Sequence, residues 1–139
     1  VRTSFIVGHP QESETMFDEM CEFAANFGFD RINVFAYSDE ETTPAHEMSE
    51  KIPAKVINKR AEILGKIASK CMEKSLKGEI GKEVQIVIDG ESEEHEYLLS
   101  AKELIWAPEI DGEIYVNDRT SDEELEFGKI YKAKITDMV

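Results

Sequence analysis

The chain has 139 residues, of which 41% are hydrophobic, and its formal net charge is −14. This length suits one ordinary domain or two small ones. The apolar runs are too short for a membrane helix, and the N-terminal stretch lacks the pattern of a signal peptide. Two isolated cysteines, Cys21 and Cys71, are typical of a reducing, cytoplasmic setting. Because the first residue is Val1 and not Met, we expect a piece of a longer protein.

The negative charge is unevenly distributed along the chain. Residues 1–76 carry 9 basic and 13 acidic side chains, whereas residues 77–139 carry 7 and 17, so the net charges are −4 and −10. A strongly acidic surface repels phosphate backbones and attracts basic partners. The alternative is that the charge serves solubility alone.

The chain opens with the pattern of a strand followed by a helix. Residues 3–7 form an apolar run closed by Gly8-His9-Pro10, which predicts a strand buried on both faces, as in a parallel sheet. Apolar residues then recur at helical spacing over residues 16–27. Ser13 is the expected N-cap of this helix, and Gly28 is its expected end.

A second strand and a second helix follow. Residues 32–37 predict a strand, and residues 38–44 form a polar loop. Pro53 suits the first turn of a long helix, despite an internal glycine at position 65. One side of this helix should carry its apolar residues, Val56, Ile57, Ile63, Leu64, Ile67, Ala68, Cys71 and Met72. The order βαβα predicts a parallel sheet with a right-handed crossover. Two such units cannot close a sheet, which again indicates a piece of a larger fold.

The second half changes to the alternating pattern of strands. Apolar residues alternate with others over residues 84–88, and Asp89-Gly90 predicts a turn. Further strands are expected near residues 97–100, 113–117 and 129–136. About five short strands in about 60 residues predict a small antiparallel barrel of the OB type.

The stretch Trp106-Ala-Pro-Glu-Ile-Asp-Gly-Glu-Ile-Tyr-Val116 is the most specific motif of this half. Pro108 should fix the entry into a hairpin, and Asp111-Gly112 should form its turn with a positive φ at Gly112. Trp106, Glu109 and Asp111 are candidates for a rim that faces a partner. Glu109 and Asp111 would then pair with Lys or Arg of that partner.

The sequence resembles the radical S-adenosylmethionine methylthiotransferases over nearly its whole length. The stretches RTSFIVGHPQESE, FDRINVFAYSDEETTPA and IPAKVINKRAEIL resemble the last βα units of the TIM-like barrel of that family, and WAPEIDGEIYV with FGKIYKAKIT resembles the TRAM domain that follows it. The resemblance implies an α+β chain in which residues 1–76 are the C-terminal part of the barrel. Residues 77–139 would be a five-stranded, OB-like TRAM barrel.

The family has a branch that modifies tRNA and a branch that adds a methylthio group to the β-carbon of an aspartate in a small-subunit ribosomal protein. The motif APEIDGEIYV is similar to the ribosomal-protein branch. The charge of −10 also favours a basic protein substrate and makes a nucleic-acid partner unlikely. Two alternatives stay open, an RNA-binding TRAM region of a tRNA enzyme and a free-standing acidic interaction module.

The resemblance also implies cofactors, namely two 4Fe–4S clusters and S-adenosylmethionine in the full-length enzyme. The three-cysteine motif that holds the radical-generating cluster is absent from this chain. We therefore expect this piece to bind no cluster, to contain no catalytic residue and to be inactive alone. His9, His46 and His95 have no spacing suited to a metal site.

Five residues are the candidates for cofactor contact in the full-length enzyme. Gly8, Pro10 and Glu12 follow the first strand, at the carboxyl end where barrel enzymes build their sites. By resemblance, Tyr37 and Ser38 end the next strand beside the adenosine. The alternatives are a loop glycine, a helix-capping acid and ordinary packing.

Overall fold

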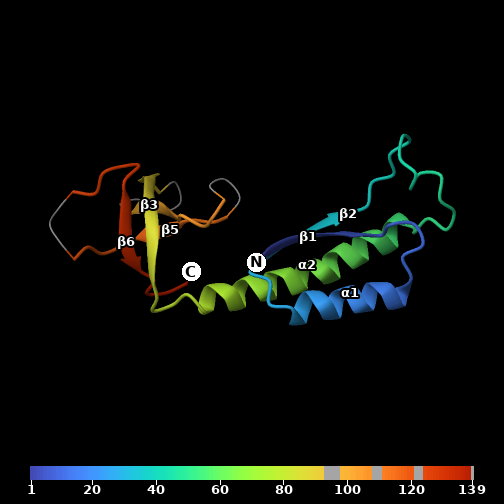
Figure 1. The fold of residues 1–139 in the computed structure, drawn as a ribbon, viewed down its shortest axis with the longest axis horizontal. Coiled ribbons are helices and arrows are strands. Elements are labelled where there is room, and N and C mark those ends of the chain that lie inside the picture. The colour runs from blue at the N-terminus through green and yellow to red at the C-terminus, as the bar shows by residue number, and fades with distance from the viewer. Residues whose placement is uncertain (93–97, 108–110, 121–123, 139) are drawn as a thin grey trace. The chain divides into compact units, whose positions relative to one another are not determined.

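The computed structural model describes residues 1–92, 98–107, 111–120 and 124–138, and it divides into two compact units (Figure 1). The N-terminal unit, Val1–Gly78, contains β1 (Arg2–Val7), α1 (Glu14–Asn26), β2 (Arg31–Ala36) and α2 (Ala54–Lys77). The C-terminal unit, Glu79–Val139, contains β3 (Glu83–Glu91), β4 (Leu99–Glu103), β5 (Ile114–Val116) and β6 (Ile130–Lys134).

Helix α1 begins and ends at the signals that its sequence contains. The Ser13 side chain accepts a hydrogen bond from the Met16 N–H at 3.1 Å, which satisfies one of the free amides of the first turn. Phe27 is the C-cap, and Gly28 follows with a φ of 91° that favours glycine. The predicted cap and end of this helix are confirmed.

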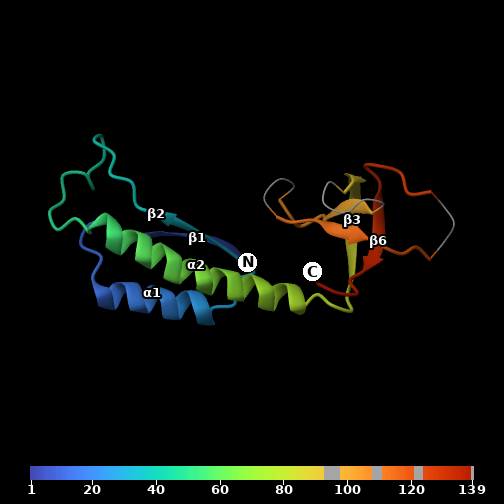
Figure 2. The same ribbon diagram turned by 180° about the vertical axis from the view of Figure 1, so that it is seen from behind.

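Strands β1 and β2 pair in parallel, as the βαβα order predicted, with Phe5 opposite Val34 and Ile6 opposite Phe35. Figure 1 and Figure 2 show both helices on the same side of these strands. The prediction that the first strand is buried on both faces is therefore wrong. Ile6 and Phe35 are 57% and 53% exposed, because no described element covers the second face.

The core of the N-terminal unit lies between the strands and the helices. Its fully buried centre consists of Val7, Phe17, Ala24 and Leu64. Helix α2 begins after Pro53, which is its N-cap, and contributes Leu64 to this core. The expected apolar side of α2 is only partly correct, since the exposed fractions of Val56, Ile63 and Met72 lie between 37% and 40%.

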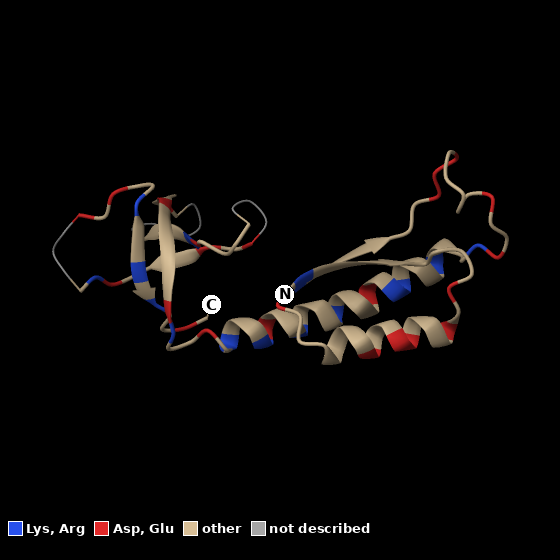
Figure 3. Ribbon diagram, in the orientation of Figure 1, with Lys and Arg blue, Asp and Glu red and all other residues tan. Residues whose placement is uncertain are grey.

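The two helices of this unit carry opposite charge (Figure 3). Helix α1 has four acidic residues and no Lys or Arg, whereas α2 has seven basic residues and two acidic ones. Opposite charges on neighbouring helices favour their association, although each exposed charge contributes little by itself. One basic residue of α2, Arg60, is buried, which the helical pattern alone does not explain.

The C-terminal unit is an antiparallel sheet with the strand order β5-β4-β3-β6. Its core consists of Ile86, Ile88 and Ala101, which lie on one face of β3 and β4. The described residues form four strands, so the predicted count of five strands and OB-like closure is not confirmed. Whether the N-terminal unit belongs to a radical S-adenosylmethionine barrel likewise stays a prediction.

Two predicted turns of this sheet are wrong. Strand β3 continues through Asp89-Gly90, and the register with β4 shifts between Ile88 and Gly90, which is a β-bulge and not a turn. Glycine tolerates such a bulge because it has no side chain to displace. The connection from β4 to β5 spans residues 104–113 and is not a two-residue hairpin, and Gly112 does not have a positive φ.

Candidate functional site

The loop after β1 has an unusual backbone that α2 supports. Gly8 has a φ of 84°, and a Cβ placed there would lie 2.5 Å from Cγ1 of Ile57. Gln11 has a φ of 70°, and its N–H donates to the Glu50 carbonyl at 3.2 Å. Backbone strain of this kind persists only where the surrounding structure imposes it. The loop from Gly8 to Glu12 is therefore a defined structure and not a loose connection.

A buried ion pair closes this loop. Arg60 Nη1 donates to Glu12 Oε1 at 2.6 Å and to the Glu12 carbonyl at 3.0 Å, and the two side chains are only 9% and 6% exposed. The second carboxylate oxygen, Oε2, accepts the Gly8 N–H at 3.0 Å. Both oxygens of Glu12 are thus bound within the protein, so this carboxylate stabilises the loop from inside.

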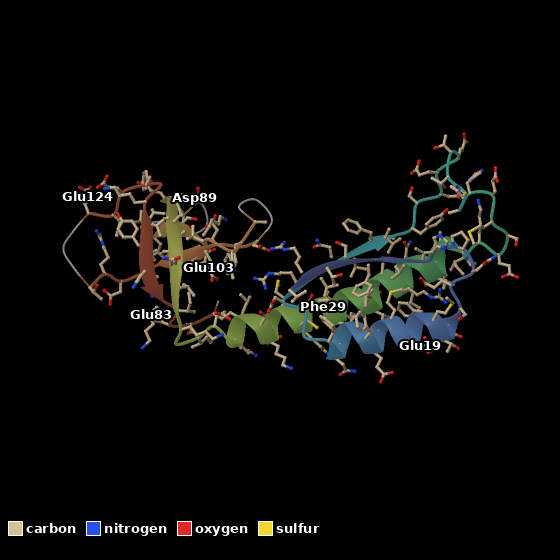
Figure 4. All side chains as sticks on the ribbon, viewed as in Figure 1. Glu19, Phe29, Glu83, Asp89, Glu103 and Glu124 are labelled. Carbon is tan, nitrogen blue, oxygen red and sulfur yellow. The ribbon has the colours of Figure 1, made fainter. Side chains whose placement is uncertain are left out.

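The same loop forms one wall of a groove of about 820 Å³. Three methionines, Met16, Met20 and Met48, also line this groove. The flexible methionine side chain adapts readily to irregular ligands. Glu19 extends from α1 and adds a carboxylate (Figure 4). The residues that line the groove are Ile6, His9, Pro10, Gln11, Glu12, Met16, Glu19, Met20 and Met48. Its size and mixed lining are those of a small-molecule site.

A polar network follows the end of β2. Asp39 accepts hydrogen bonds from the Tyr37 hydroxyl at 3.1 Å and from Lys51, and His46 Nδ1 lies 3.1 Å from the same carboxylate. The hydrogen bond from Lys51, and then those from His46 and Tyr37, lower the pKa of Asp39. Desolvation, followed by the hydrogen bond to Asp39, raises the pKa of Tyr37. This network fixes the chain that leaves β2.

The two strand ends meet through an aromatic contact. The rings of His9 and Tyr37 are 5.5 Å apart in an edge-to-face arrangement. The structure therefore brings Gly8, Pro10 and Glu12 into one loop and places Tyr37 against it. Ser38 does not line the groove, and its hydroxyl donates to Glu40 at 2.7 Å.

Two residues of this region, Arg60 and Met48, could not be found from the sequence motifs, and the role of a third, His9, was not predicted. Arg60 lies 48 residues after Glu12 and looks like any other cation of a helix rich in Lys and Arg. Met48 belongs to the loop before α2, which has no regular pattern. The sequence places His9 in the stretch that closes the first strand but does not indicate that it lines a groove. Residues far apart in the sequence meet here only through the tertiary fold, as Arg60 does with Glu12.

The second candidate site lies in the C-terminal unit. Trp106 is half-buried and lines a pocket of about 210 Å³ together with Val87, Asp89, Lys102, Glu103 and Leu104. Figure 4 labels Asp89 on β3 and Glu103 on β4. The lining of this pocket thus combines an indole side chain, two acidic residues and Lys102.

The role predicted for Asp111 at a partner-facing rim is wrong. Asp111 is only 7% exposed, and its Oδ2 accepts the Ala107 N–H at 2.8 Å while its own N–H donates to the Ala107 carbonyl at 3.1 Å. This carboxylate closes its own loop, because a buried acid requires hydrogen-bond donors. Glu109, the other predicted acid, and Pro108 lie outside the described residues.

Metal ligands do not gather in either site. Within the described ranges, no group of three or more His, Cys, Asp or Glu side chains could hold a metal ion. Of the helices that the structure describes, none has the length and apolar character to cross a membrane.

Comparison with known proteins identifies the C-terminal unit. The TRAM domain family matches residues 80–139, so the chain is a protein with a TRAM domain. Three curated relatives are each named ribosomal protein uS12 methylthiotransferase RimO. The relative from Sulfurimonas denitrificans is 76% identical over 139 residues, the one from Sulfurovum sp. 57% over 139 residues, and the one from Aliarcobacter butzleri 54% over 141 residues.

These matches cover the whole chain but only 31% to 32% of each relative, so the chain spans about a third of their length. With this identity over every residue, the chain corresponds to one segment of the proteins named RimO. The resemblance noted in the sequence is thereby confirmed.

Proposed function

We propose that this chain is part of an enzyme that methylthiolates the β-carbon of an aspartate in ribosomal protein uS12. The observation that carries this proposal is the 76% identity over the whole chain to a relative named for that activity. The enzyme acts in the cytoplasm, where its ribosomal substrate is found. The activity belongs to the longer protein.

The N-terminal unit supplies one side of the S-adenosylmethionine site. The groove at the carboxyl end of β1 supports this assignment by its position, since βα barrels build their sites there. Apolar walls with a few polar groups also fit a nucleoside ligand. The Tyr37 ring contacts His9, which lines the groove. Gly8 and Glu12 determine the conformation of the loop that forms the groove wall.

The residues present do not fit an iron–sulfur cluster. Such a cluster needs several cysteine thiolates, and the chain has two cysteines, Cys21 and Cys71, which lie in different helices. The two 4Fe–4S clusters of the full-length enzyme would be held by other parts of that protein. The isolated chain is therefore inactive in this proposal.

The C-terminal unit docks the basic protein substrate. Residues 77–139 have a net charge of −10, which attracts a basic protein and repels RNA. The pocket beside Trp106 is the proposed contact, in which the acidic lining residues Asp89 and Glu103 would attract a Lys or Arg side chain of the substrate. This pocket takes over the docking role that the sequence had assigned to Asp111.

One observation favours RNA as a competing partner of this unit. Strand β6 exposes Lys132 and Lys134 on the same face. However, Glu83 lies directly opposite Lys134 in the sheet, and only Gln85 lies opposite Lys132. Glu83 on the neighbouring strand therefore partly neutralises the positive charge of this face. The net negative charge of the unit favours a basic protein over RNA as its partner.

A binding titration tests the docking proposal. Labelled uS12 and a labelled tRNA anticodon stem-loop are each titrated with the chain at about 50 and 200 mM salt, where electrostatic binding differs strongly. We expect uS12 to bind, more weakly at the higher salt, and the RNA not to bind. Binding of the RNA alone would overturn the proposal.

Matched variants locate the contact. Asp89→Asn with Glu103→Gln should weaken uS12 binding about threefold or more, because two partner-facing charges are lost. The control, Glu62→Gln with Glu73→Gln, removes the same charge from exposed positions of α2. Equal weakening by both pairs would mean that total charge acts, and not the pocket beside Trp106.

A further inference from the structure

Helix α2 and the segment just before it contact the loop after β1, residues 8–12, which forms one wall of the groove. The Ile57 side chain occupies the space that a Cβ at position 8 would need. Arg60, one turn later, reaches the end of the same loop at Glu12. Just before the helix, the Glu50 carbonyl accepts the Gln11 N–H. Three contacts from one segment thus determine the backbone of residues 8–12.

Arg60 is buried, and its charged group is bound to Glu12. A single nitrogen, Nη1, contacts both the carbonyl and the carboxylate of Glu12, and the guanidinium carbon lies 5.2 Å from the centre of the Phe17 ring. Burying an ion pair adds little net stability, because desolvation offsets the attraction between the charges. What the pair does provide is one defined geometry, since a shifted loop would leave two buried charges without partners.

We infer that Arg60 and Glu12 are positioning residues that set the shape of the groove wall, and that Glu12 acts on this loop and not on a ligand. Both carboxylate oxygens already have a partner inside the protein, Oε1 with Arg60 and Oε2 with the Gly8 N–H, and the Glu12 side chain is only 6% exposed. That this wall faces S-adenosylmethionine rests on the proposed function, whereas the positioning itself rests on the contacts alone.

Four variants separate positioning from simple stabilisation. Arg60→Met and Glu12→Gln each remove one charge, and the double variant removes both. Lys66→Met is the matched control, because it also replaces a cation of α2 by methionine, but at an exposed position. Exchange of the Gly8 and Gln11 amide protons is measured by NMR, together with thermal unfolding and binding of S-adenosylmethionine by calorimetry.

Arg60→Met should speed exchange at Gly8 and Gln11 by about tenfold or more, the equivalent of one lost hydrogen bond, and lower the unfolding midpoint. In the double variant the midpoint should recover, because no buried charge is left unpaired, while exchange should stay fast. Lys66→Met should change neither quantity. Normal exchange in Arg60→Met, or recovery of slow exchange in the double variant, would overturn the inference.

Ligand binding distinguishes this inference from the proposed function. If the chain binds S-adenosylmethionine, Arg60→Met should weaken its affinity about tenfold, also in the stable double variant. Unchanged affinity despite fast exchange would show that the loop does not shape the site. If the unmodified chain does not bind S-adenosylmethionine, the proposal that this chain contacts that ligand is refuted. The positioning role of Arg60 and Glu12 is then tested by amide exchange alone.

Discussion

Replacing Gly8 by alanine tests whether the loop after β1 is imposed by its surroundings. Gly8 has a φ of 84°, where a residue with a Cβ is strained, and the new Cβ would lie 2.5 and 2.9 Å from Cγ1 and Cγ2 of Ile57. Two separate costs therefore arise from one methyl group, a backbone cost and a packing cost.

Their magnitudes follow from the geometry. The left-handed conformation costs an L-residue about 1–2 kcal/mol, and inserting a methyl group into an occupied space typically costs about 1–3 kcal/mol. Alanine also lowers the conformational entropy of the unfolded chain, which stabilises the folded state by about 0.4–1 kcal/mol and offsets part of these costs. We expect Gly8→Ala to lower the free energy of unfolding of the N-terminal unit by about 3 kcal/mol.

The assay is urea unfolding followed by circular dichroism at 222 nm, because both described helices belong to the N-terminal unit. Gly65→Ala is the control. Gly65 lies inside α2, has no positive φ and has no atom within 4 Å of an added Cβ, so the same substitution there should stabilise by about 0.5–1 kcal/mol.

The packing cost can be removed by a second change. In an Ile57→Ala background the two γ carbons are gone, so Gly8→Ala should cost only the backbone share of about 1–2 kcal/mol. The reasoning is refuted if Gly8→Ala stabilises the chain as Gly65→Ala does. An unchanged cost in the Ile57→Ala background would refute the packing share alone.

Three further predictions concern the other contacts. Asp111→Ala should destabilise the C-terminal unit by about 1–3 kcal/mol, because the Ala107 N–H loses its hydrogen-bond acceptor. The fluorescence of Trp106, the only tryptophan in the sequence, would report this loss in a urea titration. An unchanged unfolding midpoint would contradict the role assigned to Asp111. The lowered pKa of Asp39 means that its contribution to stability is present at neutral pH and is lost as the pH falls through that pKa. Lys51→Met should move this pKa back upwards in a carboxyl NMR titration, and a pKa that does not move would show that Lys51 is not the main cause. Ser13→Ala should cost about 1 kcal/mol through loss of the N-cap, measured at 222 nm, whereas Ser13→Asp should not.

Local features of the N-terminal unit could be predicted from the sequence. The Ser13 cap and Gly28 define α1 because capping depends on residues within one helical turn. The parallel pairing of β1 and β2 follows from the βαβ order, which allows few other arrangements. The motif at residues 106–116 also led to the correct family, because a family motif depends on residue identities and not on their contacts.

Predictions failed where a residue's environment comes from distant segments. Ile6 and Phe35 look like core residues but are exposed, because both helices cover the other face. Asp111 looks like a surface acid but is only 7% exposed, and its carboxylate accepts the Ala107 N–H. The Gly90 bulge was mistaken for a turn, since both use glycine after an acid and only the pairing with β4 separates them.

The sequence by itself determined the elements that depend on neighbouring residues, together with the family to which the chain belongs. Only the tertiary structure decided which side chains form the groove wall. Arg60 and Glu12 are 48 residues apart, and nothing local marks Arg60 among the cations of α2. Their pairing follows from the packing of α2 beneath β1, because burial forces two opposite charges to meet once that packing has formed.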